Sequence, residues 1–371
     1  MSRIVIASDS FKGSLSSEEV ARAAAKAVRA RFPSCEVAEL SVADGGEGTS
    51  VALTQSLAGS FVSCSVHDPL GRPTGASYGI AGDTAIIEMA AASGLPLLRK
   101  EERNPLITST FGTGEMIADA LLSGCRRFLV GIGGSATNDG GTGMLAALGV
   151  RFLDSDGAAI EPCGGSLADI ARIDLSAMLP ALREASFTVA CDVDTPFCGP
   201  EGASAVFAPQ KGATVAQVAE LEAGMASFAA LVRSSLGVDI ADMPGAGAAG
   251  GLGGAFHAFL GAKLRSGIDM VLDAAGFDSL LAGASLVITG EGKADSQTPK
   301  GKTAAGILRR AKAAGVPALL IAGKVESSPD LLGMGFKAIL QVTPEGMPLE
   351  EAMLPEVASD NIYNTLYSYF E

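Results

Sequence analysis

The chain has 371 residues and 48% of them are hydrophobic, so it can bury the cores of two ordinary domains and does not read as a disordered chain. Its formal net charge of -14 predicts repulsion from nucleic acids and anionic membrane surfaces. Six cysteines without a CxxC pair and only two histidines argue against a zinc site or a disulfide framework. The first residues show no signal-peptide pattern and no uninterrupted apolar stretch reaches the length of a membrane span, so we expect a cytoplasmic protein.

The first sixty residues alternate between strand and helix patterns. Residues 3–7 (RIVIA) read as a buried parallel strand. Residues 16–32 carry an apolar stripe at helical spacing after a start rich in Ser and Glu. Residues 35–44 and 46–59 repeat the strand-then-helix order, which is typical of an α/β sheet.

From residue 61 the pattern changes to short alternating segments separated by turns. Three strand candidates, which predict an antiparallel meander, cover residues 61–68, 72–80 and 84–90. Further along, the pattern predicts helices at 114–124 and 214–237 and strands at 126–132 and 187–193. We interpret this change as the beginning of a second module.

The α/β alternation resumes near residue 284. It predicts strands at 285–290, 317–323 and 336–342, a helix at 301–315 and a closing helix. Two strands from the beginning of the chain and three from its end match the size of small doubly wound parallel sheets. We therefore predict an α/β protein with two domains: residues 1–60 plus 284–371 form the doubly wound domain, and residues 61–283 form an inserted α/β domain with a mixed sheet.

The stretch GIGGSATNDGG, residues 131–141, follows one predicted strand and fits the GxGxxA pattern of a dinucleotide-binding loop. Hydroxyls, an amide and a carboxylate fill its variable positions, where a dinucleotide loop needs only small residues. This composition favours phosphate groups bound by backbone N–H groups, with Asp139 close enough to hold a metal ion. A tight turn capped by Asn138 or Asp139 is the alternative. A P-loop is absent, because Ser296 stands where the first glycine of GxxxxGKT would fall.

Polar residues follow three strands of the predicted doubly wound sheet, at the edge where such sheets bind ligands. They are Asp9, Ser10 and Lys12 after the first strand, Asp44 and Glu47 after the second, and Glu291, Lys293 and Asp295 after strand 285–290. Each loop alone is explained equally well by helix capping, but the three together favour a site.

A second acidic pair, Asp192 and Asp194, lies at the end of the predicted strand 187–193, and Lys211 follows in the segment VFAPQKGA. An acidic pair in a loop bounded by glycine and proline can hold Mg²⁺ or serve as a general base. A solvated turn is the alternative.

Together these motifs resemble the bacterial glycerate kinase family of type 1, the glycerate 2-kinases. The resemblance rests on DSFKGS, ADGGEGT, DPLGR, GIGGSATNDGG, ACDV with FCGPEGAS, FAPQKGAT, GAGAAGGLG and VITGEGKAD, which occur in the family's order. Two positions depart from it, since the family commonly has proline at Ser8 and arginine at Lys293. The resemblance implies a flavodoxin-like domain and an α/β insert with the site in the cleft between them, and transfer of the γ-phosphoryl group of ATP, with Mg²⁺, to the 2-hydroxyl of D-glycerate.

On this interpretation each group of residues has an expected role. Phosphoryl transfer needs positioning and neutralisation of charge, which backbone amides, lysines and Mg²⁺ supply. We expect Asp192 to accept the hydroxyl proton, and Lys12 and Lys293 to assist catalysis. The expected substrate-binding residues are Asp9, Ser10, Arg72 and Lys211; the expected ATP-binding loop is Gly133, Gly134, Ser135, Ala136, Thr137 and Asn138; the expected metal ligands are Asp44, Glu47, Asp139 and Asp194.

Alternatives remain open at this point. Nothing in the residue spacing selects the 2-hydroxyl over the 3-hydroxyl, and another small hydroxy acid would suit the same residues. A nucleotide or organic-acid sensor without turnover is the alternative of a different class. Carboxylates beside phosphates argue against it, because a pure anion binder gains nothing from them unless a metal ion intervenes.

Overall fold

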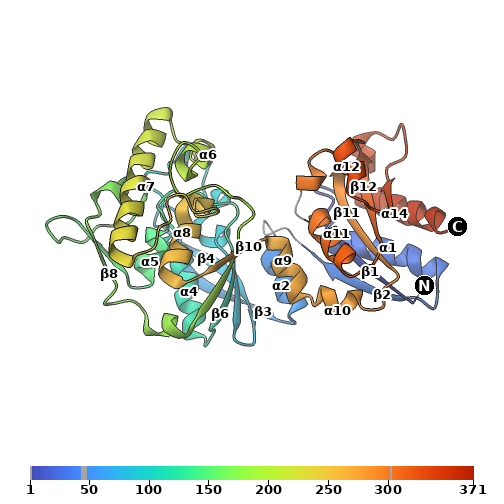
Figure 1. Cartoon of the computed structure of the whole chain (residues 1–371), viewed down its shortest axis with the longest axis horizontal. Coiled ribbons are helices and arrows are strands. Elements are labelled where there is room, and N and C mark those ends of the chain that lie inside the picture. The colour runs from blue at the N-terminus through green and yellow to red at the C-terminus, as the bar shows by residue number, and fades with distance from the viewer. Residues whose placement is uncertain (1, 43–47, 301–302) are drawn as a thin grey trace. The chain divides into compact units, whose positions relative to one another are not determined.

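The computed structural model describes residues 2–42, 48–300 and 303–371 and divides into two compact units (Figure 1). Unit 1 comprises Met1–Asp44 and Gly267–Glu371, and unit 2 comprises Gly45–Ser266. Both predicted domain boundaries, after residue 60 and before residue 284, lie further along the chain than these. The helix after residue 48 belongs to unit 2 because Ser50 donates to Glu88 there at 2.7 Å. The segment after residue 266 belongs to unit 1, where Asp269 accepts from Arg310 at 2.9 Å.

Unit 1 is built on a five-stranded sheet that is parallel throughout, as predicted. The strand order β13-β12-β11-β1-β2 is the flavodoxin-like order, with the order reversing at the β1/β11 pair. The strands are β1 (Arg3–Ser8), β2 (Glu36–Ser41), β11 (Leu286–Ala294), β12 (Ala318–Val325) and β13 (Ala338–Gln341). β11 extends beyond the predicted strand 285–290, since Glu291 and Lys293 still pair with β12. These two side chains therefore lie on the strand and not in the loop after it.

Helices cover both faces of this sheet, so the predicted doubly wound architecture is confirmed (Figure 1). Ile4, Ile6 and Ile288 pack toward α1 (Ser17–Arg31) and α14 (Pro355–Tyr369), whereas Leu320 and Ala322 pack toward α11 (Thr303–Ala313) and α12 (Pro329–Gly333). This division follows from the alternation of side chains along a strand. The helices of unit 1 are α1 (Ser17–Arg31), α9 (Gly267–Ala274), α10 (Phe277–Leu281), α11 (Thr303–Ala313), α12 (Pro329–Gly333), α13 (Leu349–Ala352) and α14 (Pro355–Tyr369).

Unit 2 contains a six-stranded mixed sheet of order β10-β9-β6-β5-β4-β3. β3 (Ser60–His67), β4 (Pro73–Ala81) and β5 (Thr84–Glu88) form the predicted antiparallel meander. β6 (Arg127–Gly131), β9 (Ser186–Ala190) and β10 (Lys263–Arg265) continue the sheet in parallel from β5. β10 and the separate hairpin of β7 (Arg151–Leu153) with β8 (Arg172–Asp174) are too short to show a sequence pattern.

The helices described in unit 2 are α2 (Thr49–Ser56), α3 (Ala90–Ser93), α4 (Phe111–Leu122), α5 (Thr142–Ala147), α6 (Ala203–Phe207), α7 (Val215–Leu236) and α8 (Ala248–Leu260). α7 begins at a Thr214–Gln217 capping box and ends at Gly237, whose φ of +72° suits a helix C-terminus. Within the described residues, α7 alone is long and apolar enough to cross a membrane. One of its faces, including Met225, Phe228 and Val232, is part of the unit 2 core.

Candidate active site

The stretch 131–141 forms the connection from β6 to α5 and is mostly buried. Gly133 and Gly134 are exposed, whereas the side chains from Ser135 to Asp139 lie inside unit 2. Among the residues that the structure describes, no group accepts a hydrogen bond from the backbone N–H of Gly133, Gly134 or Ser135. Three consecutive unpaired N–H groups, two of them on exposed residues, are suited to bind an anion.

Lys211 connects the loop 131–141 to another segment of unit 2 through two hydrogen bonds. It lies in the short 3-10 helix Pro209–Lys211, and its side chain is 1% exposed. The ammonium Nζ donates to Ser135 Oγ at 2.7 Å and to the Thr137 carbonyl at 2.6 Å. Burial lowers the pKa of Lys211 to about 7, and the nearby Asp139 carboxylate opposes that shift. Lys211 is predicted to bind substrate, but the partners of its ammonium among the described residues are Ser135 and Thr137 of the loop.

The Asp139 carboxylate accepts four hydrogen bonds inside unit 2, and these bonds explain why an acidic residue is found in this turn. Its Oδ2 accepts from the backbone N–H of Thr110 at 2.7 Å, from the Thr110 hydroxyl at 2.7 Å and from Gly143 N–H at 3.2 Å. Its Oδ1 accepts from Gly141 N–H at 3.1 Å. Burial raises the pKa of Asp139, and the four donors oppose this by stabilising the ionised form. A fully buried carboxylate with four donors is a poor ligand for Mg²⁺, so the structure argues against the metal role expected for Asp139.

A hydroxyl-rich segment before α4 supports the same loop and was not singled out from the sequence. Thr108 Oγ1 donates to the Ala136 carbonyl at 3.0 Å. Ser109 N–H donates to the Pro69 carbonyl at 2.9 Å, which connects this segment to the β3–β4 turn. The run ITST, residues 107–110, a few residues before the predicted helix 114–124, is the signal that was available, but its sequence is equally typical of ordinary helix capping.

The glycines of the loop allow close backbone packing. Gly140 and Gly141 have φ of +59° and +75°, a conformation that side chains other than glycine rarely adopt. Gly250, in the GAGAAGG segment, packs so closely that a Cβ there would lie 2.1 Å from the Thr137 carbonyl oxygen. GAGAAGG therefore forms the start of α8 and packs against the Thr137–Gly140 backbone, as the N–H of Gly140 donating to the Gly250 carbonyl at 3.0 Å also shows.

Two buried polar atoms of the loop have no hydrogen-bond partner in the described part of the chain. They are Thr137 Oγ1 and Asn138 Oδ1; the Asn138 amide nitrogen does donate, to Ser204 on α6 at 3.1 Å. Unpaired buried polar atoms are costly, and they commonly mark a place where water or a ligand completes the structure.

The parallel strands β5, β6, β9 and β10 end side by side. Glu88, Gly131, Ala190 and Arg265 are direct neighbours across the sheet. The loop after Gly131 and the half-buried Asp192, two residues beyond Ala190, therefore leave adjacent strands at the same edge. Asp194 lies further along that loop and is exposed. Arg265 is the last residue of β10 and lies at this edge. The sequence did not indicate it as a site residue, because a strand of three residues shows no recognisable pattern.

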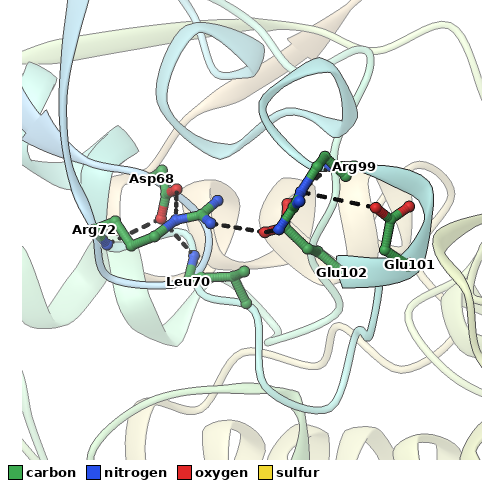
Figure 2. A network of polar contacts seen from close by, with 6 residues as sticks. All are labelled: Asp68, Leu70, Arg72, Arg99, Glu101 and Glu102. Carbon is green, nitrogen blue, oxygen red and sulfur yellow. Dashed lines mark hydrogen bonds and ion pairs between the residues drawn. The ribbon is translucent and has the colours of Figure 1, made fainter.

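Arg72 ends the turn between β3 and β4, where two carboxylates orient it (Figure 2). Its Nε donates to Asp68 at 2.6 Å and its Nη1 donates to Glu102 at 2.9 Å. Arg99 donates to the same Glu102 oxygen at 3.0 Å, and these bonds lower the pKa of Glu102 to about 2. Within the described ranges, the Nη2 atom of Arg72 has no partner, which leaves one edge of an oriented guanidinium available.

In unit 1, the predicted site residues Asp9, Ser10 and Glu291 lie at the carboxyl ends of the paired strands β1 and β11. Asp9 accepts from Ser10 N–H at 2.7 Å and from the Thr303 hydroxyl at 3.2 Å. Glu291 accepts from Thr298 at 2.7 Å, and burial, together with the charges of Asp9 and Asp295, raises its pKa to about 6.

The two lysines of this edge differ in their partners. Lys293 is paired with Asp295 and Glu326, each at 3.0 Å, so its charge is already compensated. Lys12 is exposed and forms no ion pair with any residue that the structure describes.

Two of the four predicted metal ligands can be followed in the described part of the chain. Asp44 and Glu47 lie outside the described residues, Asp139 is saturated with donors, and Asp194 is exposed. No group of three His, Cys, Asp or Glu side chains that could hold a metal ion occurs in residues 2–42, 48–300 and 303–371. Asp9 and Glu291 form an acidic pair in unit 1, and Mg²⁺ bound together with phosphates often uses only one or two protein carboxylates.

Known proteins resemble this chain along almost its whole length. Residues 4–370 match the profile described as the glycerate kinase family. A glycerate kinase of Bacillus subtilis (strain 168) is 48% identical over 94% of this chain and 92% of its own length. A glycerate 2-kinase of Escherichia coli (strain K12) is 46% identical over 97% of this chain and 95% of its own. A crystal structure assigned as glycerate kinase 2 of Salmonella typhimurium LT2 has a TM-score of 0.90 at 44% identity, covering 100% of this chain and 97% of that one.

Proposed function

Because this chain belongs to the glycerate kinase family, we propose that it transfers the γ-phosphoryl group of ATP to the 2-hydroxyl of D-glycerate, giving 2-phosphoglycerate and ADP. One observation carries this proposal: a relative named glycerate 2-kinase matches 97% of the chain at 46% identity. Transfer to the 3-hydroxyl, or to another small hydroxy acid, would use the same kinds of residues. The proposed enzyme acts in the cytoplasm.

The loop 133–138 is proposed to bind phosphate groups of ATP. The N–H groups of Gly133, Gly134 and Ser135 have no acceptor within the described residues, which supports this role, as do the buried atoms of Thr137 and Asn138 that lack a partner there. Phosphoryl transfer depends on positioning, and Lys211 holds the loop through Ser135 and Thr137. We therefore assign Lys211 to the positioning of this loop and not to direct contact with glycerate.

Asp192 is proposed to accept the proton of the glycerate hydroxyl as that oxygen attacks phosphorus. Its support is its position, since it leaves β9 beside the strand that carries the loop 133–138. A carboxylate that takes this proton keeps the attacking oxygen nucleophilic while the bond to phosphorus forms.

Arg72 is proposed to bind the glycerate carboxylate. Asp68 and Glu102 already fix its guanidinium, so binding would cost little further side-chain entropy. Its free Nη2 edge can donate to a carboxylate oxygen.

The unit 1 residues have proposed roles in handling the phosphates. Lys12, which has no described ion-pair partner, is proposed to bind a phosphate oxygen. Lys293 is proposed only to orient Asp295 and Glu326, because both already neutralise it. Asp9, which accepts a hydrogen bond from the Ser10 N–H, and Glu291 are suited to hold the Mg²⁺ that accompanies ATP. This ion would neutralise charge on the phosphates.

Phosphorus NMR of the reaction with D-glycerate, ATP and Mg²⁺ tests this proposal. We expect a signal for 2-phosphoglycerate that grows as ADP forms. A 3-phosphoglycerate signal would show that the 3-hydroxyl, and not the 2-hydroxyl, accepts the phosphoryl group. Nucleotide binding without any phosphoglycerate or ADP would contradict the kinase proposal and favour a sensor. Saturable binding of NADH with no turnover of ATP would favour a dinucleotide-binding protein.

A further inference from the structure

Unit 1 contains a cavity of about 750 Å³ at the carboxyl edge of its sheet. It is lined by residues from the ends of β1, β11, β12 and β13 and from the segment that follows β13. It includes the β1/β11 pair, where the strand order reverses and where doubly wound sheets bind their ligands. None of the catalytic roles proposed above explains why a space of this size exists here.

Apolar side chains form a large part of the cavity lining. Phe11, Val342, Met347, Leu349 and Met353 contribute to it. Met347 is held in place by Asn361, whose amide nitrogen lies 3.5 Å from the Met347 sulfur. Flat or bulky apolar surface of this kind suits the faces of a heteroaromatic ring.

Polar groups occupy the rest of the lining. Ser14 lines the cavity, and its buried hydroxyl has no partner among the described residues. Residues 343–347 all line the cavity, among them the exposed Glu345. Such donors and acceptors suit the edge of a base and the hydroxyls of a ribose.

Three lysines, Lys12, Lys293 and Lys324, also line the cavity. Lys293 and Lys324 face Glu326 at 3.0 and 3.7 Å, so their charges are partly compensated. Lys12 has no such partner in the described ranges. A ligand that carries phosphate next to its apolar and hydroxyl-bearing parts would match this distribution.

We propose that this cavity binds the adenosine part of ATP. The inference rests on the proposed kinase function and adds the location of the nucleoside. Glycerate is a poor alternative, because a three-carbon acid without apolar surface would leave most of the space and all of the apolar lining unused. The volume lies within the range of sites that bind nucleotide-sized ligands.

The absence of tryptophan from the sequence makes a direct test possible. Leu349 lines the cavity and is 73% exposed, so Leu349→Trp places a single indole at the cavity without disturbing the core. Leu354→Trp is the matched control, since Leu354 is 54% exposed, lies close in sequence and does not line the cavity. Each variant is titrated separately with adenosine, ADP and D-glycerate while indole fluorescence is recorded.

We expect adenosine and ADP to quench Leu349→Trp in a saturable manner through base stacking, and to leave Leu354→Trp unchanged. Leu349→Ala should raise the KM for ATP about tenfold with little change in the KM for glycerate, whereas Leu354→Ala should change neither. Quenching by glycerate and not by adenosine would overturn the inference.

The two proposals fail in different ways. If the wild-type protein makes phosphoglycerate but neither adenosine nor ADP quenches Leu349→Trp, the location of the nucleoside is wrong and the kinase proposal stands. If adenosine quenches but the wild-type protein makes no phosphoglycerate, the cavity is a nucleoside site and the kinase proposal is wrong.

Discussion

The buried ammonium of Lys211 donates to the hydroxyl of Ser135 at 2.7 Å, which joins two motifs that are 76 residues apart in the chain. Lys211→Met keeps the length and apolar stem of this side chain but removes both bonds to the loop. We expect kcat/KM to fall about 100-fold while circular dichroism stays unchanged, because catalysis depends on the position of the loop. Lys263→Met, at an exposed lysine of the same unit, is the control. A change of less than about threefold would contradict the positioning role.

Lys211 should also make stability depend on pH. Its pKa in the folded protein is about 7, below the ordinary 10.5, so between these values the unfolded chain holds a proton that the native chain has released. The free energy of unfolding of the wild type, relative to Lys211→Met, should therefore rise with pH from about 7 to 10, by at most roughly 1.4 kcal/mol per pH unit. Urea denaturation at pH 7, 8 and 9 measures this. A difference that stays constant or falls with pH would contradict it.

Asp139→Asn tests whether the central carboxylate is structural. The asparagine amide places an NH₂ group, which is a donor, against N–H and O–H groups that are also donors. The free energy of unfolding should therefore fall by about 2–4 kcal/mol. The Mg²⁺ concentration for half-maximal rate should not change, since all four donors to Asp139 come from the protein. Thr110→Ser, which keeps the hydroxyl, is the control. A shift of that Mg²⁺ concentration by about tenfold would restore Asp139 as a metal ligand.

Asp192→Asn tests the proton acceptor. We expect kcat to fall by about 100-fold or more and both KM values to stay within about threefold, because the change removes an interaction made only as the hydroxyl attacks. Asp156→Asn, in an exposed turn of the same unit, should leave the kinetics unchanged. An Asp192→Asn enzyme with nearly wild-type kcat would show that another group takes the proton.

Arg72→Lys tests the proposed carboxylate site. A lysine keeps the positive charge but cannot contact Asp68 and Glu102 and still present a free edge. We expect the KM for glycerate to rise about tenfold with little change in the KM for ATP. Arg127→Lys, at an exposed pair with Asp83, is the control. An increase in the KM for ATP alone would show that Arg72 binds the nucleotide and not glycerate.

β1, β12 and the first half of β11 could be predicted because they are buried, nearly continuous apolar runs, and they place both ends of the chain in one sheet. The domain boundaries could not be predicted, because an amphipathic helix does not specify its partner. Thr49–Ser56 and Gly267–Ala274 each have a buried face, but only the fold shows which sheet or helix covers it. The length of β11 was underestimated for a similar reason, since Glu291 and Lys293 are polar yet pair with β12.

The loop 131–141 was predicted as a ligand-binding turn, but its internal roles depend on distant residues. The buried Asp139 carboxylate accepts two hydrogen bonds from Thr110, which lies 29 residues earlier. Lys211 was recognised as a charge in a motif, and nothing in the sequence indicates that it reaches Ser135. Residue types predict which chemistry is present, whereas the assignment of a side chain to ligand or to scaffold needs its three-dimensional partners.

The split of unit 1 between the two ends of the chain has a consequence for biosynthesis. β1 needs β11 as a neighbour, and β11 begins only at Leu286, after all of unit 2. A ribosome therefore delivers the whole of unit 2 before the first sheet can be completed, and domains generally fold as units during synthesis. Until then β1 and β2 lack the neighbouring strand β11, so the first sheet is completed only by the last segment of the chain to be synthesised.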